Sequence, residues 1–194
     1  MTASPLAHAI AGALALASFA SSPATAQEAT AVQADNAEIA SMFTADQADR
    51  SATPIDWTVV GPRDRARLAR IAELLEAGAV RTGQDFHYAA VLYEHGSRPD
   101  DYLTAHVLAM AALARGRLQA QQIAASSLDR YLLSIGRSQV LGTQFEPGAG
   151  GIVQRNYDQD ALPESLRAAL GQSREALDER RRLLSRYIQP VGTK

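Results

Sequence analysis

Apolar residues at helical spacing, in runs that glycines separate, constrain the fold of this chain more than any other feature. Leu68, Ile71 and Leu75 recur at positions i, i+3 and i+7, which places their side chains on one face of a helix. Glycine often ends a helix because it adopts the left-handed backbone conformation without strain. Three glycines follow further apolar runs at intervals of 20 residues: Gly96, Gly116 and Gly136. We therefore predict a mainly α fold, in which short links join antiparallel helical hairpins.

The expected helices cover most of the chain from Asp35 onward. The first begins at Asp35 or Asn36, either of which is a candidate N-cap. The second begins at Pro62, which suits a first helical turn, and ends at Gly78, so that Trp57 falls in the loop before it. Further helices are expected over these ranges: 85–95, 100–116, 117–135, 163–171 and 173–187. Their rhythm is tetratricopeptide-like, but no self-similarity with the period of about 34 residues is present, so the pattern is not a true repeat.

The segment 139–157 departs from the helical pattern. Two runs that favour strands, 139–146 and 152–157, flank the glycine-rich sequence 147–151. This arrangement is typical of a small β-hairpin. An irregular loop explains the same residues equally well, so both alternatives stay open.

The first 26 residues contain no Asp, Glu, Lys or Arg. An apolar stretch precedes Ala24-Thr25-Ala26, where small residues stand at positions −3 and −1 of a cleavage site. We predict a signal peptide over 1–26, a flexible lead-in over 27–34 and a single helical domain over 35–190. The protein is then exported, either periplasmic or secreted, with no membrane span after cleavage. An alanine-rich N-terminal helix of a cytoplasmic protein is the alternative.

Composition and missing motifs argue against several classes of function. Nineteen Lys and Arg against 21 Asp and Glu give a net charge of −2, whereas a nucleic-acid binder normally carries a basic excess. The absence of cysteine excludes thiolate metal sites and thiol catalysis. The nucleophile elbow, the phosphate loop and the metalloprotease motif are also absent. We expect no metal, no other cofactor and no nucleic-acid partner.

The last expected helix carries a run of arginines toward its C-terminal end: Arg180, Arg181, Arg182 and Arg186. A solvent-exposed face explains this run, because cations near a helix C-terminus are stabilised by the helix dipole. A phosphate or nucleic-acid site is the alternative. Three leucines of the same helix are expected to face the core: Leu177, Leu183 and Leu184.

Polar residues between 87 and 144 are the candidates for a functional site. The candidate polar site has seven members: His95, His106, Asp129, Arg130, Gln139, Thr143 and Gln144. Asp129 and Arg130 lie inside an expected helix, where a buried charge needs a partner. Each member also has a structural explanation: a helix C-terminus for His95, a core hydrogen bond for His106, an ion pair for Asp129 and Arg130, and loop capping for the rest.

The same residues resemble an uncharacterised bacterial family, a domain of unknown function. Its hallmarks are an alanine-rich helix ending in His-Gly, an Ala-His pair, Asp-Arg, and a closing Gln-x-x-Gly-Thr-Gln. Here they correspond to Ala89-Ala90, His95-Gly96, Ala105-His106, Asp129-Arg130, and Gln139 with Gly142-Thr143-Gln144. Residues 46–50, together with Asp64 and Arg67, also fit the family. The resemblance implies a fold and a shared residue set over about residues 40–190, without implying a reaction.

Two functions of different classes follow from these observations. The first is an exported, soluble helical module that binds a protein, a peptide or a small-molecule ligand, because no complete catalytic motif is present. The second is a small hydrolase or other acid–base enzyme, with His95 or His106 as the base, Asp129 as its orienting carboxylate, and Arg130 and Gln144 on the substrate. The enzyme hypothesis predicts that these side chains meet in one cleft.

Overall fold

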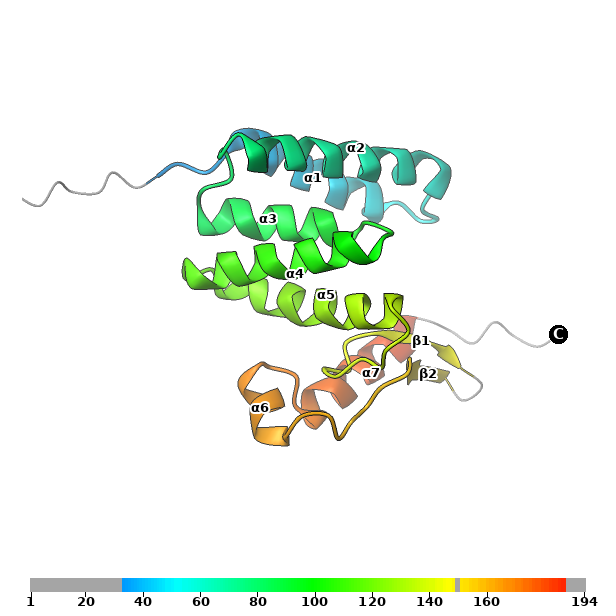
Figure 1. The fold of residues 1–194 in the computed structure, drawn as a ribbon. Coiled ribbons are helices and arrows are strands. Elements are labelled where there is room, and N and C mark those ends of the chain that lie inside the picture. The colour runs from blue at the N-terminus through cyan, green and yellow to red at the C-terminus, as the bar shows by residue number, and fades with distance from the viewer. Residues whose placement is uncertain (1–32, 149–150, 188–194) are drawn as a thin grey trace, which may run out of the picture. The chain divides into compact units, whose positions relative to one another are not determined.

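The structure, a computed structural model, describes residues 33–148 and 151–187. The predicted signal peptide, residues 27–32 of the predicted lead-in and residues 188–190 of the predicted domain lie outside the described residues. The described residues form seven α-helices and a two-stranded antiparallel sheet (Figure 1). The predicted mainly α fold class with a small β-hairpin is confirmed. Within the same residues, no helix has the length and apolar character that a membrane crossing requires.

α1 spans Ala37–Ser51 and begins where the sequence predicts. The Asn36 side chain is its N-cap and accepts hydrogen bonds from two backbone N–H groups of the first turn. Ile39 is completely buried, and Met42 packs against the same core. The cap and the apolar face together explain why this segment forms a helix.

α2 spans Trp57–Glu76 and begins earlier than predicted. The carboxylate of Asp56 accepts a 2.9 Å hydrogen bond from the N–H of Thr58 and so caps the helix well before Pro62. The prediction that Trp57 lies in a loop and that Pro62 starts the helix is therefore wrong. Pro62 lies inside the helix, where it removes one backbone hydrogen bond without ending the helix.

Three central helices form most of the core. α3 spans Gly83–Glu94, α4 spans Pro99–Ala114 and α5 spans Gln121–Ser134; they lie in successive layers in Figure 1. A 3-10 turn over Leu118–Ala120 precedes α5, so the helix predicted from residue 117 begins in this tighter form. Small side chains from all three helices are buried between them: Ala89, Ala90, Ala105, Ala109, Ala112 and Ala124.

The predicted glycine stops are confirmed, and they have two physical causes. Gly78, Gly116 and Gly136 follow α2, α4 and α5 with φ values of 62°, 78° and 75°, the left-handed conformation that ends a helix. Gly96 follows α3 without a positive φ. A Cβ at this position would lie 2.4 Å from the Cβ of Asp101, so glycine is required by the close approach of α4.

The hairpin forms over part of the ambiguous segment. β1 (Phe145–Gly148) pairs antiparallel with β2 (Gly151–Gln154), and Glu146 lies opposite Val153 in the register. The preceding residues, 139–144, form an irregular loop that the next subsection relates to the pocket.

Two helices complete the described chain. α6 spans Glu164–Ala169, and α7 spans Arg174–Tyr187 and packs against β2. Leu177 is buried as predicted, but Leu183 is 43% exposed, so the prediction that it faces the core is wrong. Leu183 lies six positions after Leu177, which places the two side chains about 120° apart around the helix axis.

Candidate functional site

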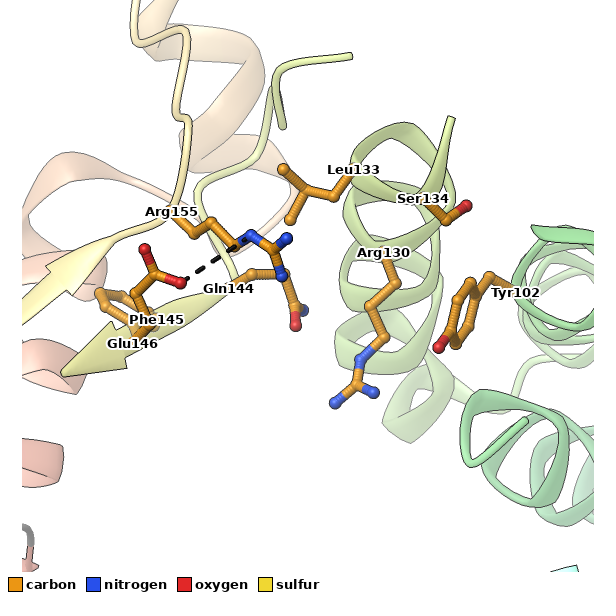
Figure 2. Close-up of a pocket in the computed structure, with 8 residues that line it drawn as sticks. All are labelled: Tyr102, Arg130, Leu133, Ser134, Gln144, Phe145, Glu146 and Arg155. Atoms are coloured by element: carbon orange, nitrogen blue, oxygen red, sulfur yellow. Dashed lines mark ion pairs between the residues drawn. The ribbon is translucent and has the colours of Figure 1, made fainter. Parts of the chain in front are cut away.

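A pocket of about 250 Å³ opens between α4, α5 and the β-hairpin (Figure 2). Arg130 reaches it from α5 and Arg155 from the hairpin, with Gln144 between them in Figure 2. Eight residues line the pocket: Tyr102, Arg130, Leu133, Ser134, Gln144, Phe145, Glu146 and Arg155. It therefore combines two guanidinium groups with hydroxyl, amide and apolar side chains, and its two arginines and one glutamate leave one net positive charge.

The two arginines of the pocket are only loosely paired with carboxylates. Arg130 Nε lies 3.4 Å from Glu94 Oε1, within ion-pair distance, but it has no hydrogen-bond partner among the described residues. Arg155 Nε lies 3.8 Å from Glu146 Oε2, the pair that Figure 2 marks with a dashed line. The two side chains are 41% and 61% exposed. Well-formed bonds between a guanidinium and a carboxylate measure about 2.7–2.9 Å, so both arginines keep donors for a ligand.

Asp129 holds the loop that carries Gln144 to the pocket. Its carboxylate is completely buried and accepts four hydrogen bonds of 2.8–3.0 Å from loop donors. Three of these donors are the backbone N–H groups of Val140, Leu141 and Thr143, and the fourth is the Thr143 hydroxyl. Hydrogen bonds to the charged form satisfy a buried carboxylate without a counter-ion. Asp129 is therefore an anchor for the loop.

Gln139 fixes the same loop through its side-chain amide. Its Oε1 accepts a 2.9 Å hydrogen bond from the Gln144 N–H, while its Nε2 donates to the backbone carbonyls of Gln144 and Arg155. Gly142 lies between them with a φ of 72°, and a Cβ there would lie 2.6 Å from Nε2 of Gln154. The sequence Gly-Thr-Gln thus permits a tight turn that places the Gln144 side chain at the pocket.

The candidate histidines lie outside this pocket. Nδ1 of His95 lies 3.0 Å from Oδ1 of Asp46, and Nδ1 of His106 lies 2.8 Å from the backbone oxygen of Ala124. Because a carbonyl only accepts, the His106 Nδ1 carries the proton in that contact. Neither imidazole is hydrogen bonded to Asp129 among the described residues.

The structure thus divides the seven predicted site residues into three groups. Arg130 and Gln144 meet in the pocket. Asp129, Gln139 and Thr143 shape the loop behind it. His95 and His106 contact other parts of the fold. The residues that sequence analysis missed come from α4, the end of α5 and the hairpin: Tyr102, Leu133, Ser134, Phe145, Glu146 and Arg155. No pattern in the sequence links them, because their convergence depends on how the hairpin folds back toward α5.

The partner of His95 belongs to a buried ionic network between α1 and α2. Arg50 donates to Asp46 at 2.6 Å and to Asp64 at 2.8 Å, and Arg67 donates to Asp64 at 3.0 Å and to Asp49. The members recur at i, i+3 and i+4 on α1 and at i and i+3 on α2, spacings that place side chains on one helix face. That spacing is a sequence signal that could have indicated this network. Because its charges bond to one another, the network joins the two helices. Asp64 and His95 also line a small hollow of about 120 Å³.

Comparison of the chain with protein-family models, with curated proteins and with solved structures finds no match. The resemblance to an uncharacterised bacterial family stays a prediction. In the described part of the chain, no three His, Asp or Glu side chains are placed to hold a metal ion. We therefore infer the function from the chemistry of the pocket that Arg130 and Arg155 line, called the arginine pocket below.

Proposed function

We propose that the protein is an exported helical binding module that holds the carboxylate of a small ligand in the pocket between α4, α5 and the hairpin. The loose pairing of Arg130 and Arg155 carries this proposal. Both guanidinium groups line one hollow, and their contacts with Glu94 and Glu146 are longer than charge-assisted hydrogen bonds. The Arg155–Glu146 pair is exposed on both sides, at 61% and 49%, so a ligand can replace it at little cost, since such a pair contributes about 0–1 kcal/mol. Glu94 is buried and keeps its contact with Arg130 Nε, so Arg130 offers a ligand its two terminal nitrogens.

The lining of the pocket favours a carboxylate on a small apolar group. A planar guanidinium matches a carboxylate with two parallel hydrogen bonds. The single net positive charge of the pocket favours a monoanion over a phosphate with two negative charges. Leu133 and Phe145 supply apolar surface beside the arginines. The volume of about 250 Å³ is smaller than that of pockets for drug-sized ligands, which begin at about 300 Å³.

The enzyme hypothesis finds less support in the same geometry. It requires a histidine that Asp129 orients, but the Asp129 carboxylate is bonded to the loop 140–143. The described lining of the pocket contains no histidine. Binding without a chemical step is therefore the function that we propose.

Calorimetric titration with N-acetylphenylalanine and its uncharged amide tests this proposal. We expect the acid to bind and the amide to bind at least tenfold more weakly, because only the acid has the carboxylate. Arg130→Gln is expected to weaken binding of the acid by about 10- to 100-fold, as charge-assisted hydrogen bonds contribute about 1.5–3 kcal/mol. Equal binding of acid and amide, or no binding of either, would contradict the proposal.

Arg63→Gln is the matched control for this titration. Arg63 is 56% exposed and pairs with Asp49 on the α1–α2 side of the domain, and it does not line the pocket. Its replacement should leave the affinity for N-acetylphenylalanine unchanged.

The exported location has a separate test. Mass spectrometry of the protein from a periplasmic or culture fraction should find a mature chain that begins at Gln27. An intact Met1 in the cytoplasmic fraction would contradict export and would leave the pocket proposal standing.

A further inference from the structure

We infer that the ligand is an extended acidic segment of a peptide or protein, which crosses from the arginine pocket to a second arginine-lined hollow beside β2 and α7. This inference rests on the proposed function, because it takes the pocket as the place where one carboxylate binds. It adds the class of ligand and a second contact surface.

The second hollow has a volume of about 510 Å³ and is lined by β2 and the C-terminal half of α7. Its lining comprises Ile152, Val153, Arg181, Arg182, Ser185 and Arg186, so it holds three guanidinium groups and no carboxylate. Arg181 and Arg182 pair at 2.7 Å with carboxylates three residues earlier on α7, and these pairs are about half exposed. Arg186 has no ion pair among the described residues. Exposed pairs of this kind are weak, and an anionic ligand can compete with them.

The second strand of the hairpin and the residue after it connect the two hollows. The antiparallel pairing continues past β2, because the Arg155 N–H donates a 3.2 Å hydrogen bond to the Gln144 carbonyl. Val153 lies in β2, and Arg155 directly follows the end of this strand, two residues or about 7 Å further along the chain. Val153 lines the second hollow and Arg155 lines the first. An extended ligand can therefore run along the hairpin from one hollow to the other.

The charge of the two hollows points to several acidic groups in one ligand. The pocket, with one net positive charge, suits a single carboxylate. The second hollow is lined by three guanidinium groups; Arg181 and Arg182 are already paired with exposed carboxylates, and Arg186 adds a positive charge without an ion pair among the described residues. Ile152 and Val153 give this second hollow an apolar wall, which suits apolar side chains between acidic ones. Side chains of an extended peptide point alternately to opposite sides, so acidic and apolar side chains of one peptide can contact the arginines and the apolar wall.

An acidic peptide fits these features better than a nucleic acid does. Tyr102 and Phe145 line the pocket, but no aromatic ring lines the second hollow, so the path between them has no series of aromatic side chains. Single-stranded nucleic acids bind largely through stacking of successive bases on such side chains. The net charge of the whole chain is −2, which disfavours a long polyanion. The arginines toward the C-terminal end of α7 thus form a local contact for a short acidic segment.

Fluorescence anisotropy with a labelled hexapeptide that alternates glutamate and leucine tests the inference. The expected result is at least tenfold tighter binding than that of N-acetylphenylalanine, and at least tenfold weaker binding of the matched peptide with glutamine for glutamate. The double variant Arg182→Gln, Arg186→Gln should weaken peptide binding about tenfold and leave N-acetylphenylalanine binding unchanged. Arg174→Gln is the matched control, because Arg174 is 62% exposed on the first turn of α7 and lines neither hollow.

The outcomes separate this inference from the proposed function. If N-acetylphenylalanine binds but the acidic peptide binds no tighter, or if the double variant leaves peptide binding unchanged, the inference is wrong and the pocket proposal stands. If neither probe binds, the proposed function is wrong as well. Binding to vesicles of phosphatidylglycerol and phosphatidylcholine that the double variant abolishes, without peptide binding, would assign the second hollow to a lipid surface and overturn the inference.

Discussion

In the network between α1 and α2, Arg50 and Arg67 donate hydrogen bonds of 2.6–3.0 Å to buried carboxylates. In the pocket between α5 and the hairpin, Arg130 and Arg155 lie 3.4 and 3.8 Å from the nearest carboxylate oxygens. The same side chain is thus used in two ways. A tightly paired, buried arginine stabilises the position of helices, whereas a loosely paired, exposed arginine leaves its donors available.

The difference also shows why a conspicuous polar residue is a weak guide to function. Asp129 is completely buried and looks like a catalytic carboxylate in the sequence, yet loop donors occupy it. Arg155 lies in a stretch without any motif and lines the pocket. Whether a charged group is already satisfied matters more than how unusual its sequence setting is.

The largest effect is expected from breaking the buried network at Asp46. The Asp46 side chain is fully buried and contacts Arg50, His95 and Gln47. Asp46→Ala removes one of the two carboxylates that bond to Arg50 and the carboxylate that His95 contacts, so we expect a loss of about 3–5 kcal/mol in the free energy of unfolding. Urea denaturation measures this change. Asp178→Ala is the control, since Asp178 is 53% exposed in a surface pair and should cost less than about 1 kcal/mol. If both variants lost a similar amount of unfolding free energy, the claim that tightly paired, buried charges stabilise the fold more than exposed pairs would be wrong.

A smaller loss is expected from removing the anchor of the loop. Asp129→Ala leaves the N–H groups of Val140, Leu141 and Thr143 without their acceptor, so we expect a loss of about 2–4 kcal/mol. Thr143→Val removes only one of the four hydrogen bonds and should cost about 1 kcal/mol. Urea denaturation of both variants provides this graded comparison. Because the same loop positions Gln144, Asp129→Ala should also weaken N-acetylphenylalanine binding, and an unchanged affinity would show that the loop does not shape the pocket.

The smallest effect is expected from His87, a half-buried side chain whose Nδ1 has no hydrogen-bond partner among the described residues. Burial lowers the pKa of His87 below its ordinary value of 6.5, and the positive charge of Arg117 lowers it further. The folded protein therefore binds this proton less readily than the unfolded chain does. The stability that neutral His87 contributes is present above about pH 6.5 and is lost as the pH falls through the lower folded pKa.

His87→Leu should lose less stability than the wild type when the pH is lowered from about 7.5 to about 5.5. Urea midpoints at several pH values in this range measure the difference between the two proteins. Identical pH profiles would show that His87 does not contribute to the acid sensitivity of the fold.

The sequence predicted the fold better than the site because helices depend on local spacing. The apolar face of α2 and the glycines that follow α2, α4 and α5 can be identified from residues close together in the sequence. The start of α2 was mispredicted because the single cap Asp56 outweighs Pro62 as a start signal. The local sequence pattern also did not decide between a hairpin and a loop for 139–157, because a hairpin depends on hydrogen bonds between two separate segments.

The pocket depends on contacts that no local pattern contains. Arg130 and Gln144 were among the predicted site residues, but Arg155 and Tyr102 come from segments that only the folded chain brings together. Asp129 and Gln139 were predicted for the right region, and their role as loop anchors follows from the directions of their hydrogen bonds. The residues of the ionic network of α1 and α2 entered the sequence analysis only through the family resemblance, and neither their pairing nor their burial was predicted.

Nitrogen–proton NMR spectra of the arginine side chains, recorded during titration with N-acetylphenylalanine, test the central claim most directly. We predict that the Nε–H signals of Arg130 and Arg155 shift with added ligand, while those of Arg50 and Arg67 stay in place. Titration with N-acetylphenylalaninamide should move none of the four signals. Shifts at Arg50 and Arg67 without shifts at Arg130 and Arg155, or the same response to acid and amide, would contradict the account.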